Sequence, residues 1–282
     1  MGMPSRDEIV EIYAKAIAGG YAIPHINHSD FGDLYAISES GVKSHTPIVA
    51  AGTLMTTDAL GLDKIAAVAK LLAAEMDTPF ILHLDHSSSR EKCLEAIDCG
   101  YNSVMIDGSD KPLEENIEIT KSVVDYAHAR GVFVEAEVGH VARGGETTSW
   151  DANVEEAVKL VKATGVDSLA VSIGNEHGFY KEPPKLNYEL LSQVHEALPD
   201  VPLVLHGGTG IPVEDVRHAI ECGIRKVNVG TYVRCTYVAG LRDGIAEMGI
   251  ERHTADIVAF ARERAKEKID EVIDMCWANN RA

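Results

Sequence analysis

Three histidines each follow a short apolar segment of the chain. His86 ends the segment Pro79–His86, His177 follows the segment 168–173, and His206 follows the segment 202–205. A neutral imidazole donates a lone pair to a divalent metal, and three imidazoles leave the fourth position of a tetrahedral Zn²⁺ open for a substrate. The three histidines therefore predict a catalytic metal site, with separate structural roles as the alternative.

Carboxylates accompany these histidines. Asp85 precedes His86, and along a strand its side chain is expected to point the other way, where it can orient a ligand or move a proton. Asp107 and Glu137 end two further apolar segments and offer oxygen ligands, which would let the metal shift or a second cation bind.

A glycine-rich turn follows His206. Gly207, Gly208 and Thr209 precede a helix that Pro212 opens, so free backbone N–H groups and the positive helix end are available to a phosphate. Such turns also occur for steric reasons alone. The next predicted loop adds further polar groups, and barrel enzymes commonly bind phosphate after strands 7 and 8. These groups, together with a lysine that follows His177, are Asn228, Thr231, Arg234 and Lys181.

The elements that position these residues alternate between helix and strand. The predicted strands are Tyr21–Ile26, Pro47–Ala51, Pro79–His86, Ser103–Ile106, Val132–Glu137, Ser168–Ile173, Val201–Leu205 and Arg225–Val229. Helical periodicity covers 6–18, 31–43, 60–75, 90–99, 112–129, 154–163, 188–197 and 213–222. Short connections with glycine are typical of right-handed parallel crossovers, so the pattern predicts an α/β fold, a (β/α)8 TIM barrel.

The barrel is expected to form a single domain over residues 1–282. Residues 252–277 are predicted to form an additional C-terminal helix, either a solvated charged helix or a dimer contact. Because parallel strands end at one face of a barrel, the chemical groups are expected to meet there. They include Asn27, Thr53, Asp85, His86, Asp107, Glu137, His177, His206 and Asn228.

Composition limits the partners. The formal charge of −18 argues against nucleic acid and anionic membranes, so an anionic substrate must meet a locally positive pocket. The five cysteines lack metal spacing and are predicted to be reduced thiols. With no secretion signal and no apolar run long enough to cross a bilayer, the sequence predicts a cytoplasmic protein.

The motifs of this chain resemble those of a known family. The segments 85–86 (Asp-His), 103–109, 134–139, 173–181, 206–210 and 226–231 are similar to those of the class II, metal-dependent ketose-bisphosphate aldolases, which include fructose- and tagatose-bisphosphate aldolases. The similarity spans nearly the whole chain. It implies a barrel, usually a homodimer or homotetramer, in which zinc or another divalent metal converts a phosphorylated ketose to an enediolate.

The resemblance also implies roles for individual residues. His86, His177 and His206 would bind zinc, and Asp85 would act as acid and base on the C4 oxygen. Glu137 and Asp107 would hold an alternative metal position, and Asn228 would contact the enediolate. The phosphate and a monovalent cation, Na⁺ or K⁺, would lie against Gly178, Lys181, Gly207, Thr209 and Thr231.

The chain departs from the family pattern around the substrate. Thr147 stands where the family's loop glutamate moves the C3 proton, and Glu146 is the predicted substitute. Gly230 replaces an aspartate that binds a substrate hydroxyl, whereas Arg234 is kept where some members bind the distal phosphate. The segment from Pro24 to Ser29 replaces the usual Ala-Phe-Asn-x-Asn, and residues 175–176 replace Thr-Ala.

Three functions follow from this pattern. The leading interpretation is a metal-dependent lyase for a phosphorylated ketose other than ordinary fructose bisphosphate. The missing loop glutamate keeps a zinc-dependent sugar-phosphate isomerase or epimerase as an alternative. A non-catalytic, sugar-phosphate-binding accessory subunit is the third, although binding alone needs neither the carboxylate of Asp85 nor an open metal position.

Overall fold

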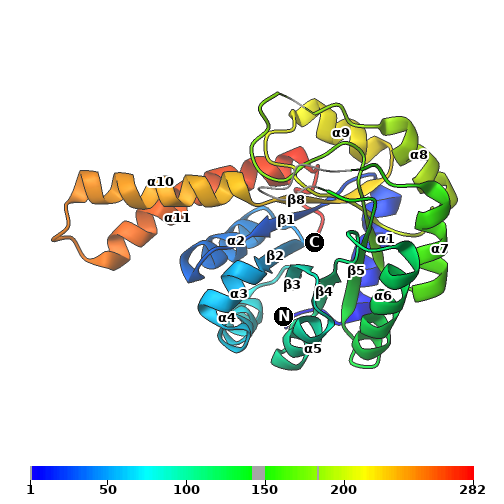
Figure 1. Ribbon diagram of the computed structural model, residues 1–282. Helices are drawn as coiled ribbons and strands as arrows, with labels where there is room; N and C mark the ends of the chain where they lie inside the picture. Colours follow the sequence, from blue (N-terminus) through cyan, green and yellow to red (C-terminus); the bar gives the residue numbers. More distant parts are fainter. Residues whose placement is uncertain (1, 142–149, 183) are drawn as a thin grey trace.

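Eight parallel strands close into a barrel. The structure is a computed structural model that describes residues 2–141, 150–182 and 184–282. The strands pair in sequence order, and β8 pairs with β1 to complete the ring (Figure 1). They are β1 Ile23–Asn27, β2 Ile48–Thr53, β3 Phe80–Ser87, β4 Ser103–Ile106, β5 Phe133–Val138, β6 Ser168–Val171, β7 Leu203–Leu205 and β8 Ile224–Val229. Each overlaps a predicted strand, so the predicted (β/α)8 barrel is confirmed.

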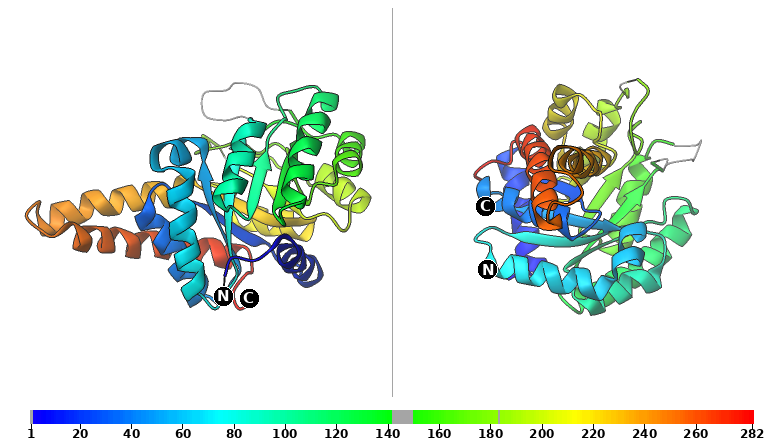
Figure 2. Two further views of the ribbon diagram at one scale, coloured as in Figure 1. Left: turned by 90° about the horizontal axis from the view of Figure 1, so that it is seen from below. Right: turned by 90° about the vertical axis from the view of Figure 1, so that its left-hand side faces the viewer.

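Helices surround this barrel (Figures 1 and 2). They are α1 Arg6–Gly19, α2 Phe31–Lys43, α3 Leu54–Leu60, α4 Leu62–Glu75, α5 Arg90–Cys99, α6 Leu113–His128, α7 Val154–Thr164, α8 Tyr188–Ala197, α9 Val213–Glu221, α10 Thr231–Met248 and α11 Thr254–Met275. The helix predicted over 60–75 begins instead at Leu62, because Gly61 adopts a φ of +89° and separates α3 from α4. Within the described ranges, no helix combines the length and the apolar character that crossing a bilayer requires.

The first helix closes one end of the barrel. Ile9 and Tyr13 of α1 join one buried cluster with side chains from the beginnings of four strands. Those strand residues are Ile23, Val49, Ile81 and Phe133. Because side chains on one face of a strand recur every second residue, the inward positions continue from this apolar layer towards the opposite, carboxyl end. That end is therefore the one left for chemistry.

The last two helices form a hairpin that projects away from the barrel (Figures 1 and 2). The segment that begins at Thr231 was predicted to be a loop, and this prediction was wrong because α10 begins there. Gly240 and Gly244 lower the helix propensity of this segment, but they allow α11 to approach closely. A Cβ atom on Gly240 would lie 2.8 Å from the Cα of Ala261. Tertiary packing thus decides a helix that local propensity does not show.

Candidate functional site

The three histidines meet at the carboxyl end of the barrel. His86 lies on β3, His177 follows β6 and His206 follows β7, and one ligand nitrogen from each lies within 4.8 Å of the others. The centroid of the His86 ring is 4.6 Å from that of His177 and 4.4 Å from that of His206. Three nitrogen donors on separate strand ends match the donor set of a catalytic zinc site with an open position.

A β-bulge in β3 directs the side chain of His86 towards the other two histidines. Adjacent side chains of a regular strand point to opposite faces, yet both Asp85 and His86 reach into the barrel mouth. The pairing of β3 with β4 shifts register between Leu84 and Ser87, and His86 adopts a φ of +50°. Such bulges re-aim side chains next to active sites. The expectation that Asp85 points away from His86 therefore fails at this bulge.

Asp107 fixes the orientation of the His86 ring. Its Oδ2 lies 2.8 Å from Nδ1 of His86, so Nδ1 carries a proton and Nε2 is the nitrogen that a metal would bind. Ser109 donates to the other oxygen of Asp107, at 2.7 Å from its hydroxyl. Glu137 approaches from β5, with Oε2 3.9 Å from His86 Nδ1, and the three groups form a second set of close ligand atoms.

These carboxylates also control the charge of His86. Burial alone lowers the pKa of His86, but the nearby Asp85, Asp107 and Glu137 outweigh burial and raise the pKa to about 9. His206 is shifted in the opposite direction, because burial and the neighbouring His86 lower its pKa. At neutral pH a metal therefore has to displace a proton from His86, whereas His206 is already neutral.

The buried ion pair of Glu135 and Lys226 orients the ring of His206. Nε2 of His206 lies 3.0 Å from Oε1 of Glu135, and the other oxygen of Glu135 accepts from Lys226 at 2.8 Å. With the Nε2 proton directed to Glu135, Nδ1 of His206 keeps its lone pair and faces Nε2 of His86 at 2.6 Å. Glu135 and Lys226 are not among the site residues that the sequence predicts. Their position two residues before Glu137 and Asn228 was the available signal, since that spacing puts them on the same face of β5 and β8.

Asp85 is held by Asn27 across the barrel mouth. The Asn27 amide donates to Oδ2 of Asp85 at 2.8 Å, while Oδ1 has no hydrogen-bond partner among the described residues. Burial raises the pKa of Asp85, but His86, His206 and Lys226 outweigh it and lower the pKa overall. The carboxylate is thus ionised, with one oxygen fixed and the other available.

Gly230 provides the space that Asn27 occupies. A Cβ atom at position 230 would lie 2.6 Å from Oδ1 of Asn27 and 3.1 Å from its Cγ. Its nearest contacts are thus with a residue that orients Asp85. Asn228, two residues earlier, lies with its amide nitrogen 3.4 Å from both ring nitrogens of His206. Its Oδ1 is buried and lacks a hydrogen-bond partner within the described part of the chain.

The loops after β6 and β7 are joined beside the histidines. The hydroxyl of Tyr180 accepts from the N–H of Glu176 at 2.8 Å and lies 3.0 Å from the carbonyl oxygen of Gly207. Gly207 has a φ of +65°, and a Cβ atom there would lie 2.0 Å from the Glu176 carbonyl oxygen. Only glycine fits this approach.

The glycine-rich turn also reaches the start of α10. Gly208 donates its N–H to the carbonyl oxygen of Asn228 at 2.9 Å, and Thr209 accepts from the N–H of Tyr232 at 3.3 Å. The residues before α9 and the first turn of α10, which Thr231 begins, are therefore adjacent. Two helix N-termini near one another favour an anion.

The remaining predicted site residues are more peripheral. Thr53 begins α3 as its N-cap, and Gly178 adopts a φ of +96° next to His177. Lys181 and Arg234 are exposed, and neither forms an ion pair with another described residue. Glu146 and Thr147 lie outside the residues that the structure describes.

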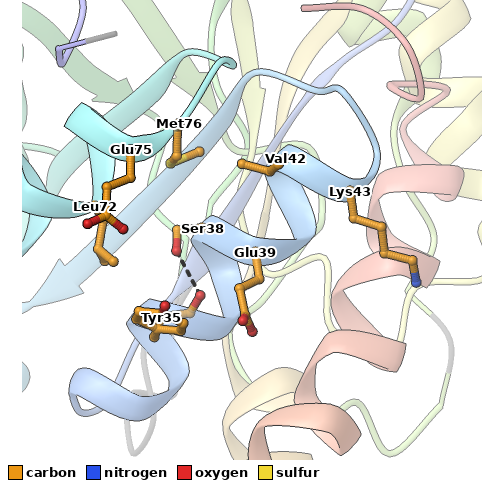
Figure 3. A pocket seen from close by; sticks show the side chains of 8 residues that line it. All are labelled: Tyr35, Ser38, Glu39, Val42, Lys43, Leu72, Glu75 and Met76. Atoms are coloured by element: carbon orange, nitrogen blue, oxygen red, sulfur yellow. Dashed lines mark hydrogen bonds between the residues drawn. The ribbon is translucent and has the colours of Figure 1, made fainter.

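A surface pocket lies apart from this site (Figure 3). Residues of α2 and α4 line it, and within α2 Ser38 donates to the carbonyl oxygen of Tyr35 at 2.8 Å. Its Glu39 is paired with Arg262 of α11 at 2.8 Å. This pocket contains none of the predicted site residues and is linked to the helical hairpin instead.

Comparison with known proteins explains the arrangement at the barrel mouth. The family model for class-II fructose-bisphosphate aldolase matches residues 7–281. The chain belongs to this family. As a class II aldolase it is a metal-dependent lyase, and this assignment does not favour the isomerase or the accessory subunit.

Solved structures agree with that assignment. The YdjI aldolase from Escherichia coli K12 is 29% identical, with a TM-score of 0.86 over 99% of this chain and 98% of that chain. The fructose-bisphosphate aldolase from Campylobacter jejuni is 23% identical, with a TM-score of 0.85 over 100% of this chain and 97% of that chain. The second comparison supports the fold of this aldolase alone.

Proposed function

We propose that this aldolase holds Zn²⁺ or another divalent ion on His86, His177 and His206 and cleaves or forms a C–C bond in a phosphorylated ketose beside Asp85. The observation that carries the proposal is the convergence of three imidazole nitrogens within 4.8 Å, next to a carboxylate whose second oxygen is available. When bound, the metal would polarise the carbonyl and the adjacent hydroxyl of the ketose.

Asp85 would move the proton of the C4 hydroxyl. In the cleavage direction, its free Oδ1 accepts that proton while the C3–C4 bond breaks, the C4 oxygen becomes an aldehyde and the electron pair remains on the C3 fragment. In the synthetic direction, the same oxygen returns the proton. Asn27 keeps the carboxylate in place by its bond to Oδ2, and the amide of Asn228 would contact the negative charge that develops on the C3 fragment.

The proposed phosphate site lies between the two helix N-termini. Gly178, Gly207, Gly208, Thr209 and Thr231 would supply backbone N–H groups and hydroxyls, with Lys181 and a monovalent cation adding positive charge. The contact between Thr209 and Tyr232 supports this placement, because it brings the turn before α9 to the first turn of α10. Asp107 and Glu137 would serve as the alternative metal ligands, supported by their closeness to His86.

The proposed substrate is a phosphorylated ketose other than fructose 1,6-bisphosphate. Gly230 offers no side chain to bind a substrate hydroxyl, and the adjacent space is filled by Asn27. Arg234 in the first turn of α10 would meet an anionic distal end. A deoxy-ketonic acid phosphate combines these two features.

We also propose a cytoplasmic homodimer or homotetramer in which each chain is one domain. Three apolar side chains exposed on the α10–α11 hairpin support the oligomer, because a partner subunit packed against the hairpin would bury them. These are Val238, Ile245 and Ile250.

Metal analysis combined with a retro-aldol screen tests the proposed function. The purified protein would be assayed against phosphorylated ketoses and deoxy-ketonic acids, with a coupled enzyme that detects released triose phosphate. Bound metal and triose release would support the lyase. Metal with only a rearranged sugar would identify an isomerase, and neither metal nor turnover would identify a binding subunit. His206→Ala controls for contaminating aldolase.

A further inference from the structure

Two histidines face one another inside the barrel, next to Asp85. His25 on β1 and His83 on β3 are 0% and 1% exposed, and their ring centroids lie 5.4 Å apart in an edge-on arrangement. Nε2 of His25 is 3.8 Å from Oδ2 of Asp85. One ligand atom from each of the three residues lies within 4.8 Å of the other two. The cluster is separate from the three histidines of the proposed catalytic metal.

The polar atoms of this cluster lack partners. Both ring nitrogens of His25, Nε2 of His83 and Oδ1 of Asp85 form no hydrogen bond with any described residue. Nδ1 of His83 lies 2.7 Å from the hydroxyl of Ser103, which leaves its Nε2 directed into the cluster. Leaving a buried polar group unsatisfied costs about 1–3 kcal/mol, so this set of atoms calls for an occupant.

The side chains of the cluster can act as ligands. Burial lowers the pKa of both histidines, so both rings are neutral and keep a lone pair at neutral pH. Asp85 contributes a negative charge. The ammonium of Lys226 opposes a positive charge on either ring, and it is itself paired with Glu135 at 2.8 Å.

We infer that His25, His83 and Asp85 form a second metal site for a divalent ion such as Zn²⁺. Two imidazoles and one carboxylate are a common donor set for zinc. This site goes beyond the proposed function, because the proposed reaction needs only the metal on His86, His177 and His206. An ion bound at this site would be coordinated by the Asp85 carboxylate, which Asn27 otherwise orients for proton transfer. Binding of the second ion would therefore inhibit turnover.

His25 contributes to this cluster and to neither of the other two ligand sets at the barrel mouth. Removal of its imidazole should therefore abolish the second metal without disturbing the ligands of the first.

Metal stoichiometry in three variants tests this inference. Metal-free protein would be titrated with Zn²⁺ in the presence of a chromophoric chelator, and folding would be checked by circular dichroism and thermal unfolding. The wild type should bind two equivalents per chain, and His25→Ala should bind only the tighter one. His206→Ala should lose the tighter equivalent instead. His28→Ala is the matched control, because His28 is 1% exposed and both of its ring nitrogens also lack partners among the described residues, but it lies outside the cluster.

Activity and crystallography provide independent measurements. Turnover of the wild type and of His28→Ala should fall as the second equivalent binds, whereas His25→Ala should keep the rate it has with one equivalent. Anomalous diffraction at the zinc edge should show a second peak between His25 and His83 in wild-type crystals. These crystals decide the matter even where His25→Ala does not fold.

Three results would overturn the inference. They are a single equivalent bound by the wild type at tenfold excess of Zn²⁺, a second equivalent retained by folded His25→Ala, or density between the two rings that has no anomalous signal and is therefore water. None of them affects the first equivalent or the triose assay, so failure of this inference is distinguishable from failure of the proposed function.

Discussion

Substitution of Gly230 by alanine should disable Asp85 without touching it. The backbone at Gly230 has a φ of −112°, which any residue adopts, so the effect of the methyl group is steric. The added Cβ would lie 2.6 Å from Oδ1 of Asn27, well inside van der Waals contact, and Asn27 has to move. That movement breaks the 2.8 Å hydrogen bond that the Asn27 amide donates to Asp85.

The magnitude follows from the charge on the acceptor. A hydrogen bond to an ionised group contributes about 1.5–3 kcal/mol, which corresponds to a loss of roughly 10- to 100-fold in kcat/KM if the bond orients Asp85 in the transition state. The assay is triose release from the best substrate of the screen, with metal content measured on the same samples. Metal content should stay at the wild-type value, because no histidine ligand is displaced.

A double-mutant cycle makes the prediction specific. Asn27→Ala alone should lower kcat/KM by a similar factor, and adding Gly230→Ala to it should cost little more, because the clash has been removed with the side chain. Wild-type activity in Gly230→Ala would refute the reasoning. So would losses that multiply fully in the double variant, since they would mean that the two residues act separately.

Three further predictions concern the metal, the proton and the fold. His206→Ala should lose the catalytic metal and nearly all turnover. The control is His218→Ala, which should keep both, because His218 is an exposed histidine on α9 that pairs with Glu221. Metal analysis that finds a full site in His206→Ala would contradict the ligand assignment. Asp85→Asn should keep the catalytic metal and lower kcat by roughly 10²-fold or more, the scale of general acid–base catalysis, and a loss of metal with a normal rate per bound ion would argue against its role in proton transfer. Burial lowers the pKa of His28 from 6.5 to about 4, so the unfolded state binds the proton more tightly and stability is lost as the pH falls from 6.5 towards 4. Between pH 7 and pH 5, His28 should lower the unfolding free energy of the wild type by about 2 kcal/mol. In urea unfolding, the unfolding free energy of His28→Leu should therefore fall by about 2 kcal/mol less than that of the wild type over the same pH range. An equal fall in both proteins would show that His28 is not the group responsible.

The barrel and the meeting of the three histidines were accessible from the sequence for one physical reason. Parallel strands joined by right-handed crossovers all end at the same rim, so His86, His177 and His206 had to approach one another once the strands were found. The family resemblance added the same fold and activity, which the comparisons support.

The contacts that the sequence did not reveal depend on close packing between distant segments. The space at Gly230 is defined by Asn27, which lies on a strand more than two hundred residues earlier. The helix α10 depends on the approach of Ala261 to Gly240, and the bulge at His86 depends on the pairing of β3 with β4. Local propensity carries none of these interactions.

The backbone conformation of His86 lowers the stability of the fold, whereas its side chain is needed for the proposed metal site. A φ of +50° costs a residue with a Cβ about 1–3 kcal/mol, and glycine or asparagine would relieve part of that strain. Selection for thermal stability alone would therefore favour the loss of this histidine, and the same substitution would remove a proposed metal ligand. In an evolving population, the chain can become more heat-stable at many positions, but at position 86 every such gain would come at the expense of the proposed reaction.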